Sequence, residues 1–149
     1  MVILVSACLL GLCCRYDGAS RPCPAVIEAA EKHTLIPVCP EIYGGLPTPR
    51  PSAERRGDRV VARDGRDVTA EYERGAQETL RLARLFGARH AILKENSPSC
   101  GCGRIYDGTF SGSLTDGNGL TAQRLQDAGL ELHGEGQVEG WLQSLESNA

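Results

Sequence analysis

The chain has 149 residues and a formal net charge of −3 at pH 7, with 41% hydrophobic and 23% charged residues. This length suits one domain with its own hydrophobic core, so we expect residues 1–149 to form a single domain. Basic and acidic residues are interspersed, which argues against a nucleic-acid polymer as the main partner. The expected partner is a small polar or anionic molecule.

The seven cysteines do not suit a disulfide-built domain, because such domains are shorter, secreted and poor in core residues. The apolar stretch at 1–10 is not preceded by basic residues and is not followed by a cleavage site of small residues. It therefore fits a buried strand better than a signal peptide. No apolar run reaches the length of a membrane span. We therefore expect a cytoplasmic protein with reduced thiols and no membrane contact, as a monomer or weak homo-oligomer.

The first third of the chain alternates strand and helix signals. An aliphatic, β-branched run predicts a strand at Val2–Ser6, followed by a functional loop. Helix start and stop residues bracket 24–33, and a second strand is predicted at 35–38. Three prolines and two glycines in 41–51 exclude regular structure there, so we expect a long functional loop.

The rest of the chain continues the alternation. A hairpin turn at Asp64-Gly65 is predicted between strands at 59–63 and 66–68. Thr69 is expected to cap a helix that ends before Gly87, because apolar residues recur there at helical spacing. These residues are Tyr72, Ala76, Leu80, Ala83 and Phe86. The later elements are a strand at 90–94, a glycine-rich loop at 107–119, a helix at 120–128, a strand at 130–133 and a helix at 138–145.

Strands that alternate with helices predict an α/β fold with a mainly parallel sheet flanked by helices, in a Rossmann-like layer arrangement. In such a sheet the carboxyl ends of the strands share one edge, where long loops form the ligand crevice. No linker, internal repeat or low-complexity tract divides the chain.

Cys8, Cys39 and Cys100 each lie where a predicted strand gives way to a loop. Segments that are distant in sequence can thus bring three thiolates together without a CxxC motif. Zinc with a fourth ligand and an iron–sulfur cluster are both open readings. Cysteine is also a common small buried hydrophobe, which is the reading we prefer for Cys13, Cys14 and Cys23.

Two metal-free readings were weighed against these. The segment from Cys8 to Arg15 superficially resembles the phosphate loop of cysteine phosphatases, but it is one residue longer than C-x5-R and holds a single glycine. Thiol exchange by Cys100-Gly-Cys102 or Cys13-Cys14 is a weak signal, because neither pair is a C-x-x-C at a helix start.

Four stretches together resemble one known family. They are VSACLLG…CRYDG within 5–18, VCPEIYGGLPTPRP at 38–51, AILKENSPSCG at 91–101 and IYDGTFSG at 105–112. They are similar to a family long catalogued as a domain of unknown function, whose characterised members are thiouracil desulfurases. The resemblance implies a [4Fe-4S] cluster held by three cysteines, matching Cys8, Cys39 and Cys100, and removal of sulfur from thiolated uracil without net redox change.

The implied mechanism uses the iron without a protein ligand as a Lewis acid on the thiocarbonyl sulfur, while water adds to the ring carbon and hydrosulfide leaves. Glu41, two residues after Cys39, is the expected acid–base group, unless it pairs with Arg50 or Lys94 as an ordinary loop carboxylate. Ser97 is expected to relay a proton and Ser99 to bind substrate, although both could merely satisfy a turn.

Three charged residues are expected to contact substrate or steady the thiolates. Lys94 ends a buried strand and should point into the crevice. Arg15 and Asp17 in the first loop are weaker candidates, because Asp-Gly is also ordinary turn chemistry. Cys102 is expected to be a bystander, since one glycine between two ligands would strain a compact cluster.

The remaining histidines, His33, His90 and His133, show no ligand spacing and are expected to be structural. Three hypotheses follow. The first is a [4Fe-4S]-dependent desulfurase acting on a thiolated nucleobase or related thioamide. The second is a zinc or cluster-binding protein without catalysis, and the third is a cysteine-dependent hydrolase or phosphatase.

Overall fold

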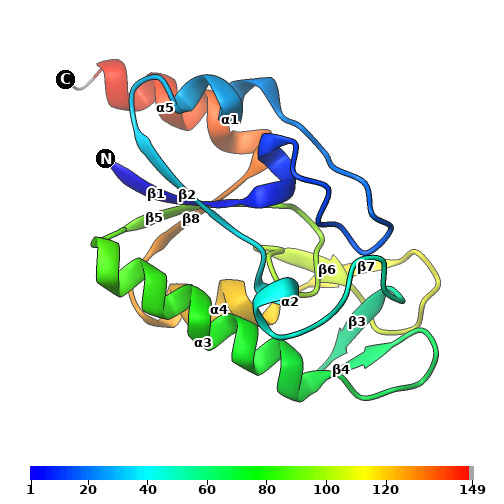
Figure 1. Cartoon of the computed structure of the whole chain (residues 1–149). Coiled ribbons are helices and arrows are strands. Elements are labelled where there is room, and N and C mark those ends of the chain that lie inside the picture. Colours follow the sequence, from blue (N-terminus) through cyan, green and yellow to red (C-terminus); the bar gives the residue numbers. More distant parts are fainter. Residues whose placement is uncertain (148–149) are drawn as a thin grey trace.

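A four-stranded parallel sheet forms the centre of the computed structural model, which describes residues 1–147 (Figure 1). The strand order is β2-β1-β5-β8. The strands are β1 (Val2–Ser6), β2 (Thr34–Val38), β5 (His90–Leu93) and β8 (Glu131–Gly134). The chain runs from β1 to β2 on one side and then crosses to β5 on the other, so the strand order reverses at β1. The expected α/β fold with a parallel sheet is confirmed.

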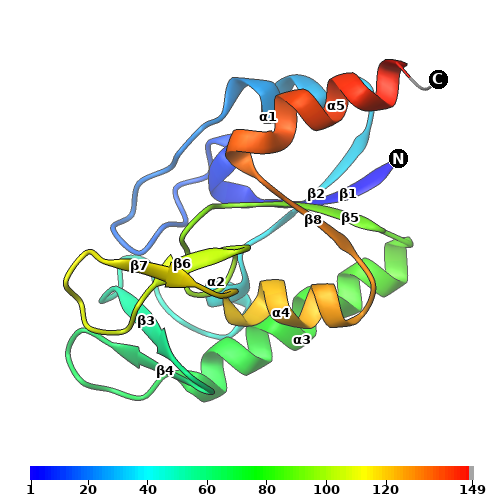
Figure 2. The same ribbon diagram turned by 180° about the vertical axis from the view of Figure 1, so that it is seen from behind.

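Helices cover both faces of the sheet (Figures 1 and 2). One face carries α1 (Pro24–Ala29) and α5 (Val138–Ser147), and the other carries α3 (Thr69–Phe86) and α4 (Leu120–Asp127). Side chains alternate between the faces, so each strand contributes to two cores. The first core includes Ile3, Val5, Ile92, Val26 and Val138, and the second includes Leu4, Ala91, Leu93, Ala83 and Leu125.

Small elements lie beyond the carboxyl ends of the central strands (Figure 1). They are two antiparallel hairpins and three short helical segments. The hairpins are β3 (Ala53–Arg56) with β4 (Arg59–Ala62), and β6 (Arg104–Tyr106) with β7 (Leu114–Asp116). The helical segments are η1 (Ala7–Leu10), α2 (Pro40–Tyr43) and η2 (Glu135–Gln137).

Three expectations about these small elements were wrong. The region 41–51 is not wholly irregular, because α2 starts at Pro40, and proline fits the first turn of a helix. The expected turn at Asp64-Gly65 is present, since the Ala62 N–H donates to the Arg66 carbonyl and Val61 bridges Asp67 in antiparallel fashion, but the strand expected at 66–68 is absent and β4 pairs with β3 instead. The strand β7 lies inside the expected glycine-rich loop at 107–119. The three strands that were not predicted, β3, β6 and β7, have only three or four residues each and are mostly polar, so none gives an apolar alternation to read.

The long helix α3 has its predicted end at Gly87, but Thr69 does not cap it. Thr69 is its first residue, and its hydroxyl accepts a hydrogen bond from the Val60 N–H at 2.8 Å. Asp67 instead accepts the Thr69 N–H at 2.9 Å. Phe86 was wrongly expected on the apolar face, since it is 49% exposed at the end of the helix. The first helix is also shorter than 24–33, because it ends at Ala29.

Backbone packs directly on backbone where α2 meets α3. A Cβ atom added at Gly44 would lie 1.9 Å from the Glu71 carbonyl oxygen, and one added at Gly75 would lie 1.8 Å from that of Pro40. Only glycine permits this approach. It fixes α2 at the carboxyl end of β2.

The chain begins at the opposite end of the sheet from the hairpins (Figure 1). The Met1 amino group lies 3.2 Å from His33 Nδ1, and Lys32 pairs with Glu146 near the end of α5. Within residues 1–147, no helix combines the length and apolar character that crossing a bilayer requires.

Candidate active site

A cavity of about 350 Å³ lies beyond the carboxyl ends of β1, β2 and β5. Cys8, Cys39 and Cys100 all line it, and Cys14 is a fourth cysteine on its wall. Cys8 is in η1 directly after β1, Cys39 directly precedes α2 after β2, and Cys100 follows β5. The parallel topology thus brings the three predicted cysteines to one cavity.

The thiols in this cavity differ in acidity. Burial is the main cause that raises the pKa of Cys8 to about 11 and that of Cys100 to about 12. Hydrogen bonding with the Cys14 thiol lowers the pKa of Cys39 to about 7 and raises that of Cys14. Buried thiols of high pKa are poor nucleophiles at neutral pH, but a metal that binds them displaces their protons. Cys8 and Cys100 therefore suit ligation better than nucleophilic catalysis.

The spacing of the cysteines distinguishes two kinds of metal site. Three thiolates bound to one zinc ion at about 2.3 Å would lie about 3.8 Å apart. Within residues 1–147, the one trio of possible ligand atoms within 4.8 Å of one another is formed by His90, Glu131 and His133. No three sulfurs of the cavity therefore lie within 4.8 Å of one another in this part of the chain, so their positions are not those of a preformed single-zinc site.

Glu41 lies on α2 with both carboxylate oxygens hydrogen-bonded. Oε1 accepts the Arg50 Nε–H at 2.9 Å, and Oε2 accepts the Ser99 hydroxyl at 2.9 Å. The Arg50 guanidinium also donates to the carbonyls of Pro47 and Cys14, at 3.1 and 2.9 Å. The predicted alternative partner Arg50 is thus present, and its guanidinium fixes the position of the carboxylate at the cavity wall.

Ser97 and Ser99 form a chain of hydroxyl groups that leads to Glu41. The two Oγ atoms are 3.0 Å apart, and Ser97 Oγ accepts the Cys100 N–H at 3.0 Å. Ser99 is buried and its Oγ lies 3.7 Å from Cys100 Sγ. The two serines therefore satisfy the turn and also connect the cavity to the carboxylate.

The other predicted contacts are placed unequally. Arg15 lines the cavity, and its Nη1 lies 3.5 Å from the Asp17 carboxylate oxygen Oδ2. Asp17 lies outside the cavity lining and accepts the Ala19 N–H at 3.0 Å, which is a turn role. Lys94 lines the cavity, but its ammonium group lies 2.6 Å from Glu135 Oε1.

Sequence reasoning missed three residues that shape the site. Cys14 was expected to be a core residue, and no signal separated it from Cys13. Glu135 lies in η2, far from the motifs in sequence. Tyr72 was assigned to the core by helical spacing, yet burial and then the neighbouring Glu41 carboxylate raise its pKa well above the usual range. A tyrosine on an otherwise aliphatic face was the one available hint.

The remaining cysteines lie away from the cavity lining. Cys102 packs with the second core and lines a separate shallow groove. Cys13 is exposed, and Cys23 packs against the first core. Cys100 therefore lines the cavity and Cys102 does not, although only Gly101 lies between them in the sequence.

Comparisons with known proteins agree with this geometry. The family model described as 2-thiouracil desulfurase matches residues 3–137. The "Uncharacterized protein YbbK" of Bacillus subtilis (strain 168) is 41% identical over 151 residues, covering 95% of this chain and all of that protein. The solved structure of the [4Fe-4S]-dependent thiouracil desulfidase TudS is 46% identical, with a TM-score of 0.88 and 97% of each chain covered. The chain belongs to the 2-thiouracil desulfurase family.

Proposed function

We propose that this protein is a [4Fe-4S]-dependent desulfidase that converts the C=S group of a thiouracil-type base to C=O and releases hydrosulfide. The observation that carries the proposal is one cavity that joins three strand-end cysteines to a carboxylate held by Ser99 and Arg50. The likeness to TudS over 97% of each chain supports the same chemistry.

Cys8, Cys39 and Cys100 would hold the cluster. The thiolate donor set and the Arg15 guanidinium on the cavity wall fit an anionic group in this cavity. When bound, the cluster supplies Lewis acidity at an iron atom that no cysteine occupies, which polarises the thiocarbonyl bond. Cys14 would hydrogen-bond the Cys39 sulfur and tune the cluster from outside its ligand set.

Glu41 would act as the general base. Its carboxylate accepts hydrogen bonds on both oxygens, and these hold it in position to take a proton from the water that adds to the ring carbon. The proton then passes along the Ser99 and Ser97 hydroxyls, which are 3.0 Å apart. The balance is C=S plus water giving C=O, hydrosulfide and a proton, with no electrons gained or lost.

The substrate side of the cavity would be set by cationic and aromatic residues. Arg15 lines the cavity with its Nη1 3.5 Å from Asp17 Oδ2 and would bind a ring oxygen, and Lys94 lines the cavity with its ammonium paired to Glu135. A volume of about 350 Å³ suits a small molecule rather than a polymer. We propose a cytoplasmic protein, a monomer or weak homo-oligomer, that acts on a thiolated nucleobase or a related thioamide.

Iron and sulfide analysis of anaerobically purified variants tests the ligand assignment. Replacement of Cys8, Cys39 or Cys100 singly by serine should abolish the cluster. The matched control is Cys102→Ser, which lies outside the cavity and should keep wild-type iron content. Full iron content in all three ligand variants, or zinc in the wild-type protein, would overturn the assignment.

Turnover of 2-thiouracil by Glu41→Gln tests the base. The variant keeps the shape of the carboxylate and should retain the cluster, while kcat falls by about 10² to 10⁴, the usual contribution of a positioned acid–base group. Near-normal kcat with normal iron content would assign the proton transfer to another group.

A further inference from the structure

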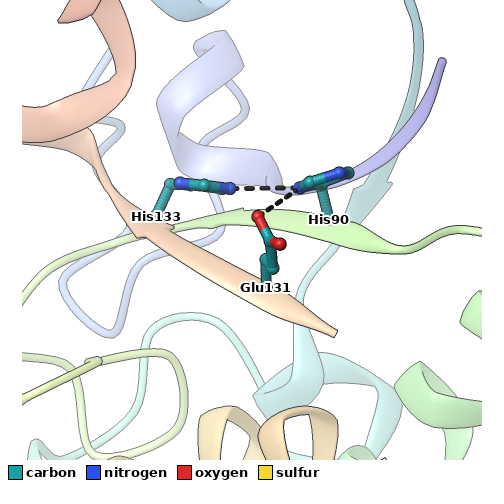
Figure 3. A group of neighbouring side chains, drawn as sticks. All are labelled: His90, Glu131 and His133. Atoms are coloured by element: carbon teal, nitrogen blue, oxygen red, sulfur yellow. Dashed lines mark hydrogen bonds and ion pairs between the residues drawn. The ribbon is translucent and has the colours of Figure 1, made fainter. Parts of the chain in front are cut away.

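A second group of metal-ligand side chains lies on the sheet itself, away from the cavity lining. It consists of His90 at the start of β5, and Glu131 and His133 on β8 (Figure 3). His90 is paired with Glu131 in the parallel register, and His133 lies two residues further along β8. Alternation along the strands therefore places all three on one face of the sheet, the face covered by α1 and α5.

The separations of their ligand atoms match those around a metal ion. His90 Nδ1 lies 3.2 Å from His133 Nε2 and 3.4 Å from Glu131 Oε2, and all three atoms lie within 4.8 Å of one another. Nitrogen and oxygen ligands at about 2.0–2.2 Å from one ion, at tetrahedral or octahedral angles, lie about 2.9–3.5 Å apart. Figure 3 shows the three groups directed toward one another.

The surroundings hold the imidazoles in place. Trp141 of α5 stacks on His133 with ring centroids 3.7 Å apart and an interplanar angle of 14°, and it lies 4.9 Å from the His90 ring. Burial first, and the nearby His90 second, lower the pKa of His133. Neutral imidazole is the form that binds metal.

We propose that His90 Nδ1, His133 Nε2 and a Glu131 carboxylate oxygen bind a divalent transition-metal ion of the zinc class, with water in the remaining positions. Two imidazoles and one carboxylate are a common donor set for Zn²⁺ and Ni²⁺. The ion would join β5 to β8 at the end of the sheet opposite the cysteines. Its effect would therefore be on the stability of the β5–β8 pair rather than on desulfuration.

Trp141 makes the site observable, because it is the single tryptophan of the chain. The experiment titrates Ni²⁺ into the anaerobically purified, cluster-loaded protein and follows tryptophan fluorescence. We expect saturable quenching by the paramagnetic ion, reversal by excess Zn²⁺, and a higher Tm with saturating Zn²⁺. Activity toward 2-thiouracil should not change.

Three variants locate the ion. His90→Gln and His133→Gln should each raise the Ni²⁺ concentration at half-maximal quenching by at least about tenfold. Loss of a group that only hydrogen-bonds a metal ligand already lowers metal affinity by that factor. Glu131→Gln tests the same site with little effect on packing, because that side chain is 70% exposed. Iron content and far-UV circular dichroism show that each variant is folded. The variants are compared by the midpoint of the quenching curve, because its amplitude, unlike its midpoint, depends on the Trp141–His133 stack.

The matched control is His33→Gln, which removes the third histidine beside the chain start and should keep the wild-type midpoint. Absence of saturable quenching in the wild-type protein would overturn the proposal. So would wild-type midpoints in the folded His90, His133 and Glu131 variants, since the ion would then be bound elsewhere.

Discussion

Arg50→Met tests whether one buried guanidinium holds the active-site wall together. The Arg50 side chain is 4% exposed and its partner Glu41 is 14% exposed. The guanidinium donates to Glu41, Pro47, Thr48 and Cys14 at 2.9 to 3.1 Å. Methionine keeps much of the length and apolar volume but removes the charge and every donor.

The loss of the cation should cost about 3–5 kcal/mol of unfolding free energy, because it leaves the Glu41 carboxylate buried without its counter-charge. With a urea m-value of about 2 kcal/mol/M, the midpoint should fall by about 2 M. The measurement is equilibrium urea unfolding of the metal-free protein in reductant, since release of a tightly bound cofactor breaks the two-state assumption.

The double variant Arg50→Met/Glu41→Gln provides the control. It removes the carboxylate that Arg50→Met leaves without a counter-charge. Its loss of unfolding free energy should therefore be smaller than the sum of the two single-variant losses by about 0.5–3 kcal/mol, the usual coupling of residues in contact. A single-variant cost under about 1 kcal/mol, or strict additivity, would refute the role given to this ion pair.

Three further predictions concern the neighbouring elements. Ser99→Ala should lower 2-thiouracil turnover by about 10²-fold while iron content stays normal, and full activity would remove the hydroxyl chain from the mechanism. Gly75→Ala should cost at least about 1–3 kcal/mol in urea unfolding, because its Cβ would overlap the Pro40 carbonyl; an unchanged midpoint would contradict the close contact. Hydrogen bonds from Thr69 and then Arg59 lower the pKa of Asp67 from 3.8 to about 2, so its stabilisation is present above pH 3.8 and is lost as pH falls toward 2. Asp67→Asn should reduce the change of Tm with pH between about pH 2 and 3.8, and the same change of Tm as in the wild-type protein would contradict this.

The central sheet was predictable because its strands are apolar runs followed by helical periodicity. Once the strands were assigned as parallel, topology alone required Cys8, Cys39 and Cys100 to meet at one edge. Short polar strands such as β3 and β7 gave no such pattern, because their pairing depends on partners rather than on an apolar face.

Partners within the site could be predicted only where they lie in the same motif. Arg50 follows Glu41 by nine residues in one loop, so their pairing was considered from the sequence. Glu135 reaches Lys94 from 41 residues away, and only the tertiary structure brings them together. The His90–His133 contact escaped prediction for the same reason, because strand register rather than sequence spacing creates it.

The position of Met1 at the end of the sheet opposite the hairpins has a practical consequence (Figure 1). A tether or fusion partner attached at residue 1 would project away from the cavity entrance. Protein immobilised on a surface by that end would keep its thiol-lined cavity open to solution. Cluster loading and desulfuration could then be followed on one sample while base, metal and reductant are exchanged above it.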